Sequence, residues 1–141
     1  MTYPKHILFL CTGNSCRSQM AEGFARKYAP HGINIYSAGV RADGMNPYMQ
    51  RVMAEKNIDI SGQSSKTVDS LPKDQIEAVF TLCDHAAQNC PVFPGEVIRE
   101  HWGFPDPAGT EGSDAEIMTV YRNVRDDIEV KLKSYFNVGH E

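Results

Sequence analysis

The residues with the clearest chemical potential lie near the N-terminus, in a short segment that begins with Cys11 and ends with Ser18. An apolar run precedes this segment and a helical pattern follows it, so it should join a buried strand to the start of a helix. Backbone N–H groups that converge at a helix N-terminus bind anions. The segment therefore predicts a cradle for a tetrahedral oxyanion, with Cys11 at its base as a nucleophile.

The residue types within the segment fit such a cradle. Gly13 permits a backbone conformation that a side chain would obstruct, and Asn14 tolerates a left-handed one. Arg17 can hold two anion oxygens through its planar guanidinium fork. The residues that we expect to bind the anion are Thr12, Gly13, Asn14, Ser15, Cys16, Arg17 and Ser18.

The position of Cys11 also predicts its reactivity. A thiol beside a helix N-terminus and a guanidinium has its pKa lowered from roughly 8.5, so we expect Cys11 to be a thiolate at neutral pH. The Ser18 hydroxyl is placed to donate to that thiolate, whereas Cys16 should point away from it and serve packing. The alternative is that Cys11 is a buried strand-end cysteine and Arg17 a surface arginine.

Displacement at an oxyanion also needs a proton for the departing oxygen, and Asp106 is the candidate donor. It lies between Pro105 and Pro107, just after the fourth apolar run, and should emerge at the same edge of the sheet as Cys11. The alternative is a turn aspartate with no catalytic role.

Cys83 and Cys90 form a second chemical feature, because two thiols that close to a disulfide supply two electrons. Cys83 ends the third apolar run, and the six residues before Cys90 lack Gly and Pro and favour a helix. Residues seven apart in a helix are about 10 Å apart along its axis, whereas a disulfide needs Cα atoms within roughly 7 Å. Forming this disulfide should therefore unwind residues 84–89. Both cysteines could instead be small core residues, while the spacings fit no common zinc site.

The rest of the chain predicts the elements that position these groups. Four runs favour buried parallel strands at His6–Leu10, Ile33–Ala38, Ala78–Leu82 and Val97–Trp102. Helices are expected over Ser15–Ala29, from Pro47 to about Asn57, and after a capping box at Ser113–Glu116. The alternation predicts an α/β fold, a three-layer sandwich with a four-stranded parallel sheet, in one domain over residues 1–141. The last helix should pack along the whole sheet.

Composition narrows the class of protein. The chain has 141 residues, 41% hydrophobic and 23% charged, with a net charge of −4. This charge argues against broad nucleic-acid affinity, and no apolar run is long enough to cross a membrane. We expect a cytoplasmic monomer whose four cysteines are kept reduced or used for catalysis.

The segment from Cys11 to Ser18, continued by Gln19–Gly23, resembles the phosphate-binding loop of the low-molecular-weight tyrosine phosphatase superfamily. Within that superfamily it is most similar to the thioredoxin-coupled arsenate reductases. The resemblance continues through Tyr36–Gly39, Thr81–Cys83, Asn89–Pro91, His101–Phe104 and Asp106–Gly109, and so covers most of the chain.

The resemblance implies a low-molecular-weight phosphatase-like fold and a relay of thiols. Cys11 would attack arsenate while Asp106 protonates the leaving oxygen. Cys83 would then attack Cys11 and release arsenite, and Cys90 would attack Cys83, leaving a Cys83–Cys90 disulfide for thioredoxin to reduce. Arg17 would hold the substrate, for which phosphate and sulfate would compete.

Two departures from the family pattern bear on function. Some of these reductases bind potassium through positions that match Asn14, Glu22 and Ser37 and an acidic residue near Ser64. Here Lys66 stands about where that acid would be, and its ammonium could replace the ion. The sequence therefore favours a protein without a metal cofactor, although potassium binding remains an open alternative.

The tyrosine phosphatase branch has aromatic residues after its Asp-Pro pair, where this chain has Ala108–Thr110. The leading hypothesis is therefore an arsenate reductase. The alternative is a low-molecular-weight protein tyrosine phosphatase that uses Cys11, Arg17 and Asp106. A third hypothesis is a non-catalytic module that binds oxyanions or senses redox state. Such a module would use the loop but would not need Asp106.

Overall fold

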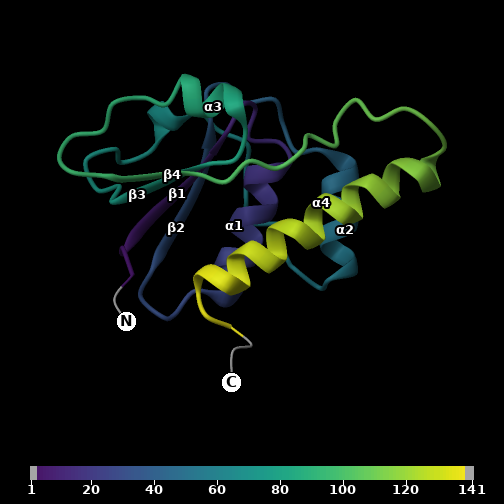
Figure 1. Ribbon diagram of the computed structural model, residues 1–141, viewed down its shortest axis with the longest axis horizontal. Helices are drawn as coiled ribbons and strands as arrows, with labels where there is room; N and C mark the ends of the chain where they lie inside the picture. The colour runs from purple at the N-terminus through teal and green to yellow at the C-terminus, as the bar shows by residue number, and fades with distance from the viewer. Residues whose placement is uncertain (1–2, 139–141) are drawn as a thin grey trace.

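The computed structural model describes residues 3–138, and its centre is one parallel sheet (Figure 1). The four strands lie in the order β2-β1-β3-β4, and each neighbouring pair is parallel. Their bounds are β1 His6–Cys11, β2 Asn34–Gly39, β3 Ala78–Thr81 and β4 Ile98–His101. The predicted four-stranded parallel sheet is confirmed, with each strand within a residue or so of its expected bounds.

Helices cover both faces of this sheet. Figure 1 shows α3 on one side and α1, α2 and α4 on the other. Their bounds are α1 Arg17–Tyr28, α2 Pro47–Glu55, α3 Asp84–Gln88 and α4 Asp114–Tyr135, with a short 3₁₀ helix, η1, at Val68–Ser70. The arrangement is the predicted three-layer α/β sandwich.

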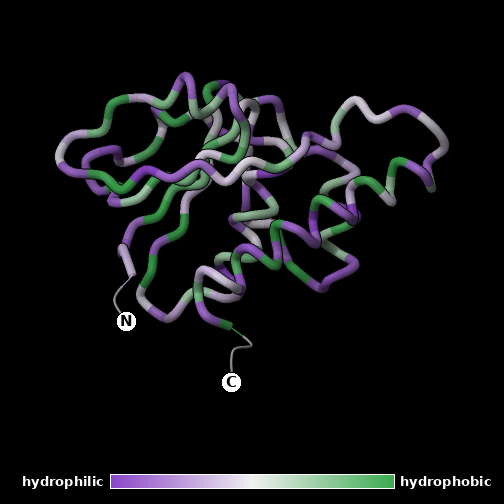
Figure 2. The backbone as a smooth tube through the Cα atoms, in the orientation of Figure 1, coloured by the Kyte–Doolittle hydropathy of each residue, from purple (hydrophilic) through white to green (hydrophobic). Residues whose placement is uncertain are grey.

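The alternation of side chains along β1 explains why two layers of helix are needed. Ile7 and Phe9 pack into a core shared with α1, α2 and α4, whereas Leu8 and Leu10 pack into a second core beneath α3 and η1. All four are fully buried, so the strand is apolar on both faces. Figure 2 shows the hydrophobic residues along β1 and the more hydrophilic loop before α4.

Local capping sets where the helices begin. Asn46 accepts a hydrogen bond from the Met49 N–H (3.1 Å) at the start of α2. Ser113 and Glu116 form the expected reciprocal capping box of α4, with both hydrogen bonds at 3.1 Å. These caps lie at the positions that the sequence predicted.

The expected packing of α4 along the whole sheet is wrong. This helix packs mainly against α1 and α2, because α1 already covers the sheet on that side. It reaches the strands near its C-terminal end, where the Tyr135 ring lies 5.1 Å from Phe80 and 5.4 Å from Trp102 between centroids. Within residues 3–138, none of the helices combines the length and apolar character that crossing a bilayer requires.

Candidate active site at the carboxyl edge of the sheet

The predicted reactive residues meet where the strands end. β1 ends at Cys11, Cys83 follows β3, and the loop after β4 carries Asp106. A pocket of about 430 Å³ opens at this edge, and its lining includes Arg17, Cys83 and Asp106. Cys11 packs in the same buried cluster as Cys83, which lines this pocket. Chain segments far apart in sequence thus converge on one site, as expected for a parallel α/β sheet.

The loop between β1 and α1 depends on two glycines and one left-handed residue. Asn14 has φ of 48°, the left-handed conformation predicted for it. A side chain at Gly13 would collide with the Asp43 carboxylate, and a Cβ at Gly39 would lie 2.7 Å from the Thr12 carbonyl oxygen. The sequence reasoning missed Gly39, although its place in the Tyr36–Gly39 motif was a signal that the strand meets the loop closely.

A buried hydrogen-bond network holds Asn14 in that conformation. Its Nδ2 donates to Ser18 Oγ (2.8 Å) and Ser37 Oγ (3.0 Å), and Gln19 Nε2 donates to the Asn14 carbonyl oxygen (3.0 Å). The hydroxyl of Ser18 therefore supports the loop as an acceptor. Among the hydrogen bonds of residues 3–138, the expected one from Ser18 to Cys11 is not found, and the partner of Ser18 Oγ is Asn14.

The surroundings of the two central thiols shift their pKa values in opposite directions. The hydrogen bond from Cys11, with others from Thr12 and Ala86, lowers the pKa of Cys83 to about 5 in spite of burial. The same hydrogen bond and burial raise the pKa of Cys11, against the effect of Arg17. Arg17 thus favours a thiolate at Cys11, as expected, while burial opposes it, and the thiolate at Cys11 stays a prediction.

Two of the donors to Cys83 are visible in the geometry. Thr12 Oγ1 lies 3.1 Å from Cys83 Sγ, and the Ala86 N–H donates to the same sulfur at 3.4 Å because Cys83 is the N-cap of α3. The sequence reasoning placed Thr12 in the anion loop only and missed this contact. A strand-end cysteine three residues before a helical N–H was the available signal.

Arg17 is fixed in the pocket, and one of its N–H groups has no hydrogen-bond partner among the described residues. It is 8% exposed, its Nη1 donates to the Phe104 carbonyl oxygen (2.9 Å), and its Nη2 lies 3.5 Å from Asp106 Oδ2. Its Nε is buried and has no hydrogen-bond partner among the described residues. An oxyanion bound in the loop would supply the missing acceptor, since buried polar groups are almost always paired.

The remaining two cysteines lie outside this pocket. Burial, followed by the charge of Asp106, raises the pKa of Cys16 to about 12, which fits the packing role expected for it. Cys90 is half-buried and is not among the residues that line the pocket. Its sulfur instead accepts a hydrogen bond from Arg99 Nη1 at 3.0 Å.

A cationic side chain lies behind the loop, next to the Asn14 network. Lys66 Nζ donates to the Ser64 carbonyl oxygen (2.7 Å) and lies 4.0 Å from Glu22 Oε1. Glu22 is 3% exposed and accepts from Ser37 Oγ at 2.6 Å. Burial lowers the pKa of Lys66, while the Glu22 carboxylate opposes that change. The ammonium therefore stands beside Glu22, one of the groups that matched a potassium site, and Arg26 Nη2 lies 2.8 Å from the same carboxylate.

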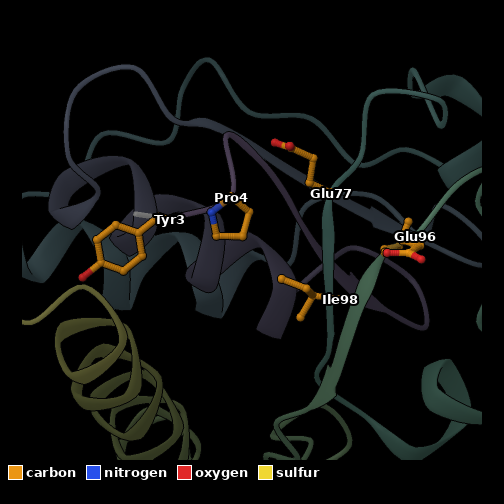
Figure 3. A pocket seen from close by; sticks show the side chains of 6 residues that line it. Tyr3, Pro4, Glu77, Glu96 and Ile98 are labelled. Carbon is orange, nitrogen blue, oxygen red and sulfur yellow. The ribbon is translucent and has the colours of Figure 1, made fainter. Parts of the chain in front are cut away.

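A larger pocket, of about 550 Å³, lies at the opposite end of the strands (Figure 3). Its acidic members are Glu77 and Glu96, and Glu77 Oε1 already accepts from the Lys5 and His6 N–H groups at 2.7 Å and 3.1 Å. Among residues 3–138, no cysteine or cationic side chain lines it. This pocket is therefore larger than the one at Arg17 but has no group suited to oxyanion chemistry.

Comparisons with known proteins agree with this geometry. The family model described as low molecular weight phosphotyrosine protein phosphatase matches residues 6–140. An arsenate reductase of Halalkalibacterium halodurans is 50% identical over 135 residues, which cover 96% of this chain and 97% of that protein. A solved arsenate reductase in the phosphate binding state has a TM-score of 0.75 at 32% identity, covering 94% of this chain and 97% of the other.

An arginine phosphatase from Geobacillus stearothermophilus shares the same architecture, with a TM-score of 0.76 at 25% identity over 95% of this chain and 92% of that one. A reductase and a phosphatase thus both share this overall fold. Since the family model spans almost the whole sequence, the chain belongs to the low molecular weight phosphotyrosine protein phosphatase family.

Proposed function

We propose that this protein reduces arsenate to arsenite with the thiols of Cys11, Cys83 and Cys90. The observation that carries the proposal is the position of Cys83 against the anion loop. Its Sγ lies 3.1 Å from Thr12 Oγ1, and it packs in the same buried cluster as Cys11. Phosphate-ester hydrolysis needs only one thiol there, whereas reduction needs a second thiol within reach of the first. The similarity to arsenate reductases over nearly the full chain supports the same activity.

In the first step, arsenate binds to the loop N–H groups and to Arg17, whose buried Nε lacks a partner among residues 3–138. Cys11 Sγ forms a bond to arsenic as one As–O bond breaks. Asp106, 52% exposed at the pocket and 3.5 Å from Arg17, protonates the leaving oxygen, and the thiol proton of Cys11 replaces that proton. The oxygen leaves as water.

In the second step, Cys83 attacks the sulfur of the Cys11–arsenic adduct. The S–S bond forms, the S–As bond breaks, and its electron pair reduces As(V) to As(III), which leaves as arsenite. The Thr12 hydroxyl and the Ala86 N–H remain beside Cys83 Sγ after Cys11 is bonded to arsenic, and both can donate to the thiolate that this step needs. Cys90 then attacks Cys83 and releases Cys11, so that the disulfide ends as Cys83–Cys90.

A dithiol donor of the thioredoxin class would reduce that disulfide and complete the cycle, as suits a protein of the reducing cytoplasm. The test is NADPH consumption in a coupled assay with thioredoxin and thioredoxin reductase, with and without arsenate. The proposal requires NADPH oxidation that depends on arsenate and one arsenite formed per NADPH. It is abandoned if no thiol donor supports arsenate-dependent turnover.

A phosphatase would need the same groups, namely the loop, Arg17 and Asp106. The structural similarity to an arginine phosphatase supports this alternative. A phosphatase would hydrolyse phosphotyrosine, phosphoarginine or a small aryl phosphate without consuming a reductant. Turnover of such an ester faster than arsenate reduction would favour it.

Replacing Asp106 with asparagine is expected to slow formation of the Cys11–arsenate adduct by about 10²-fold to 10⁴-fold, because the amide cannot deliver a proton. Phosphate affinity should change little, since the shape of the side chain is kept. Rapid-quench single turnover and competitive phosphate titration measure the two quantities. An adduct rate equal to that of the wild type at every pH would remove Asp106 from the proton-donor role.

We also propose that the Lys66 ammonium takes the place of a potassium ion beside the loop. Lys66→Met removes a charge next to buried Glu22 and is expected to lower the melting temperature by about 2–4 °C per kcal/mol lost. Potassium chloride should restore more of that loss than sodium chloride, while the wild type responds equally to both salts. Lys73→Met, at an exposed pair with Asp69, is the control. A wild type stabilised specifically by potassium would contradict the proposal.

A further inference from the structure

The segment between Cys83 and Cys90 is weakly anchored by apolar packing. Ala86 is its one buried residue within α3, and the helix has only five residues. A cavity of about 230 Å³ separates it from the strands below, lined among others by Ala87, Cys90, Arg99 and His101. A short helix with little buried surface is at the low end of local stability. Its conformation must therefore depend on polar contacts.

Two such contacts come from β4, the edge strand, which is exposed throughout. Arg99 and His101 are two residues apart on this strand, so their side chains leave the same face of the sheet. Both turn toward α3, which Figure 1 shows above the β3–β4 side of the sheet. Their partners are the two ends of the segment, Cys90 and Asp84.

Arg99 holds the C-terminal end. Its Nη1 donates to Cys90 Sγ (3.0 Å) and to the Pro91 carbonyl oxygen (3.2 Å). The guanidinium also lies 5.5 Å from the centroid of the Phe93 ring, which is 3% exposed. A planar group fixed by an aromatic face and a carbonyl has little freedom left, so its hydrogen bond to Cys90 is preorganised.

His101 holds the N-terminal end. Its Nδ1 lies 2.9 Å from Thr81 Oγ1, and its Nε2 lies 3.0 Å from Asp84 Oδ1. Thr81 is 6% exposed and belongs to β3, so the ring is fixed on the sheet side. Asp84 is the first residue of α3 and directly follows Cys83. The imidazole thus ties the start of the helix to the sheet.

We propose that Arg99 and His101 form a clamp that holds the Cys83–Cys90 segment in its helical, dithiol conformation and sets the equilibrium of the Cys83–Cys90 disulfide. Arg99 is a positioning residue for Cys90, and His101 for Cys83. The proposal deepens the proposed function, on which it rests.

The direction of the effect follows from the geometry of the reaction. When Cys90 attacks Cys83 of the Cys11–Cys83 disulfide, the new S–S bond forms and Cys11 leaves as a thiolate. The segment must then unwind, and Cys90 must leave Arg99 to reach Cys83. Contacts present in the dithiol state and lost in the disulfide state oppose oxidation. The clamp therefore keeps the thiols reduced until the relay reaches them.

The test measures that equilibrium without arsenate. In a Cys11→Ser, Cys16→Ser background the only thiols are Cys83 and Cys90, and mixtures of oxidised and reduced dithiothreitol set the disulfide fraction, read by acid quench and peptide mapping. Arg99→Met should raise the equilibrium constant for disulfide formation about threefold, and adding His101→Ala should bring the increase to about tenfold, since exposed charged contacts are individually modest. Arg99→Lys should fall between wild type and Arg99→Met.

The matched control is Arg51→Met. Arg51 is also an exposed arginine beside an aromatic ring, at 5.4 Å from the Tyr48 centroid, and pairs with Asp114 far from the cysteines. It should leave the constant unchanged. Equal constants for Arg99→Met and its background would overturn the clamp.

Amide hydrogen exchange of the reduced proteins measures the local stability of the segment without any disulfide being formed. Residues 84–88 should exchange about threefold faster in Arg99→Met and faster still with His101→Ala, while α4 is unaffected. If the background protein forms no Cys83–Cys90 disulfide, the thiol relay fails, and unaltered exchange in the variants would then overturn the clamp separately.

Discussion

Cys11→Ser is expected to lower the rate of arsenate reduction by at least ~10⁴-fold, because removal of a catalytic nucleophile costs losses of that order or more. A serine hydroxyl stays protonated where a thiol ionises, and it forms no sulfur–arsenic adduct that a second thiol could reduce. Steady-state NADPH oxidation and arsenite release measure the effect. Any activity toward aryl phosphates should disappear with it.

Binding measurements separate chemistry from folding in this variant. The loop N–H groups and Arg17 remain, so phosphate affinity should stay close to that of the wild type. Cys16→Ser, a change of a different thiol in the same loop, should cost much less because burial keeps that thiol protonated. Substantial arsenate turnover by Cys11→Ser would exclude Cys11 as the nucleophile.

Cys90→Ser is expected to release one arsenite per enzyme molecule and then stop. Cys11 and Cys83 alone can supply two electrons, but the resulting Cys11–Cys83 disulfide lies at the base of the buried loop, where both residues are under 10% exposed. A protein donor cannot reach it, whereas half-buried Cys90 is accessible. Quench-flow counting of arsenite and peptide mapping of the trapped disulfide give the stoichiometry and the pairing.

Cys83→Ser should fail one step earlier. The adduct on Cys11 should form and persist, with no arsenite released unless a small thiol replaces Cys83. Mass spectrometry of the intact protein would detect the added arsenate group. Continuous turnover of Cys90→Ser with thioredoxin, or arsenite release by Cys83→Ser without added thiol, would disprove the relay in this order.

Local patterns in the sequence were sufficient for the sheet, the helices and the loop. The apolar runs that became β1 and β3 are buried on both faces, and the caps at Asn46 and Ser113 start their helices where expected. Asn14 adopts its left-handed conformation for reasons carried by its own residue type. Hydrophobic periodicity, capping and turn preference act over a few residues, so they can be read from one chain segment at a time.

Tertiary structure decided which groups surround Cys83. The sequence placed Thr12 in the anion loop only, but in the fold Thr12 and the first turn of α3 both contact the Cys83 sulfur. The approach of Gly39 to the loop and of Lys66 to Glu22 was likewise settled by packing. Packing also settled the hydrogen bonds from β4 to the two ends of the segment after Cys83. Each of these contacts joins two chain segments that come together only once the sheet has formed. Burial and neighbouring donors set a pKa or a close contact, and neither is encoded in spacing along the chain.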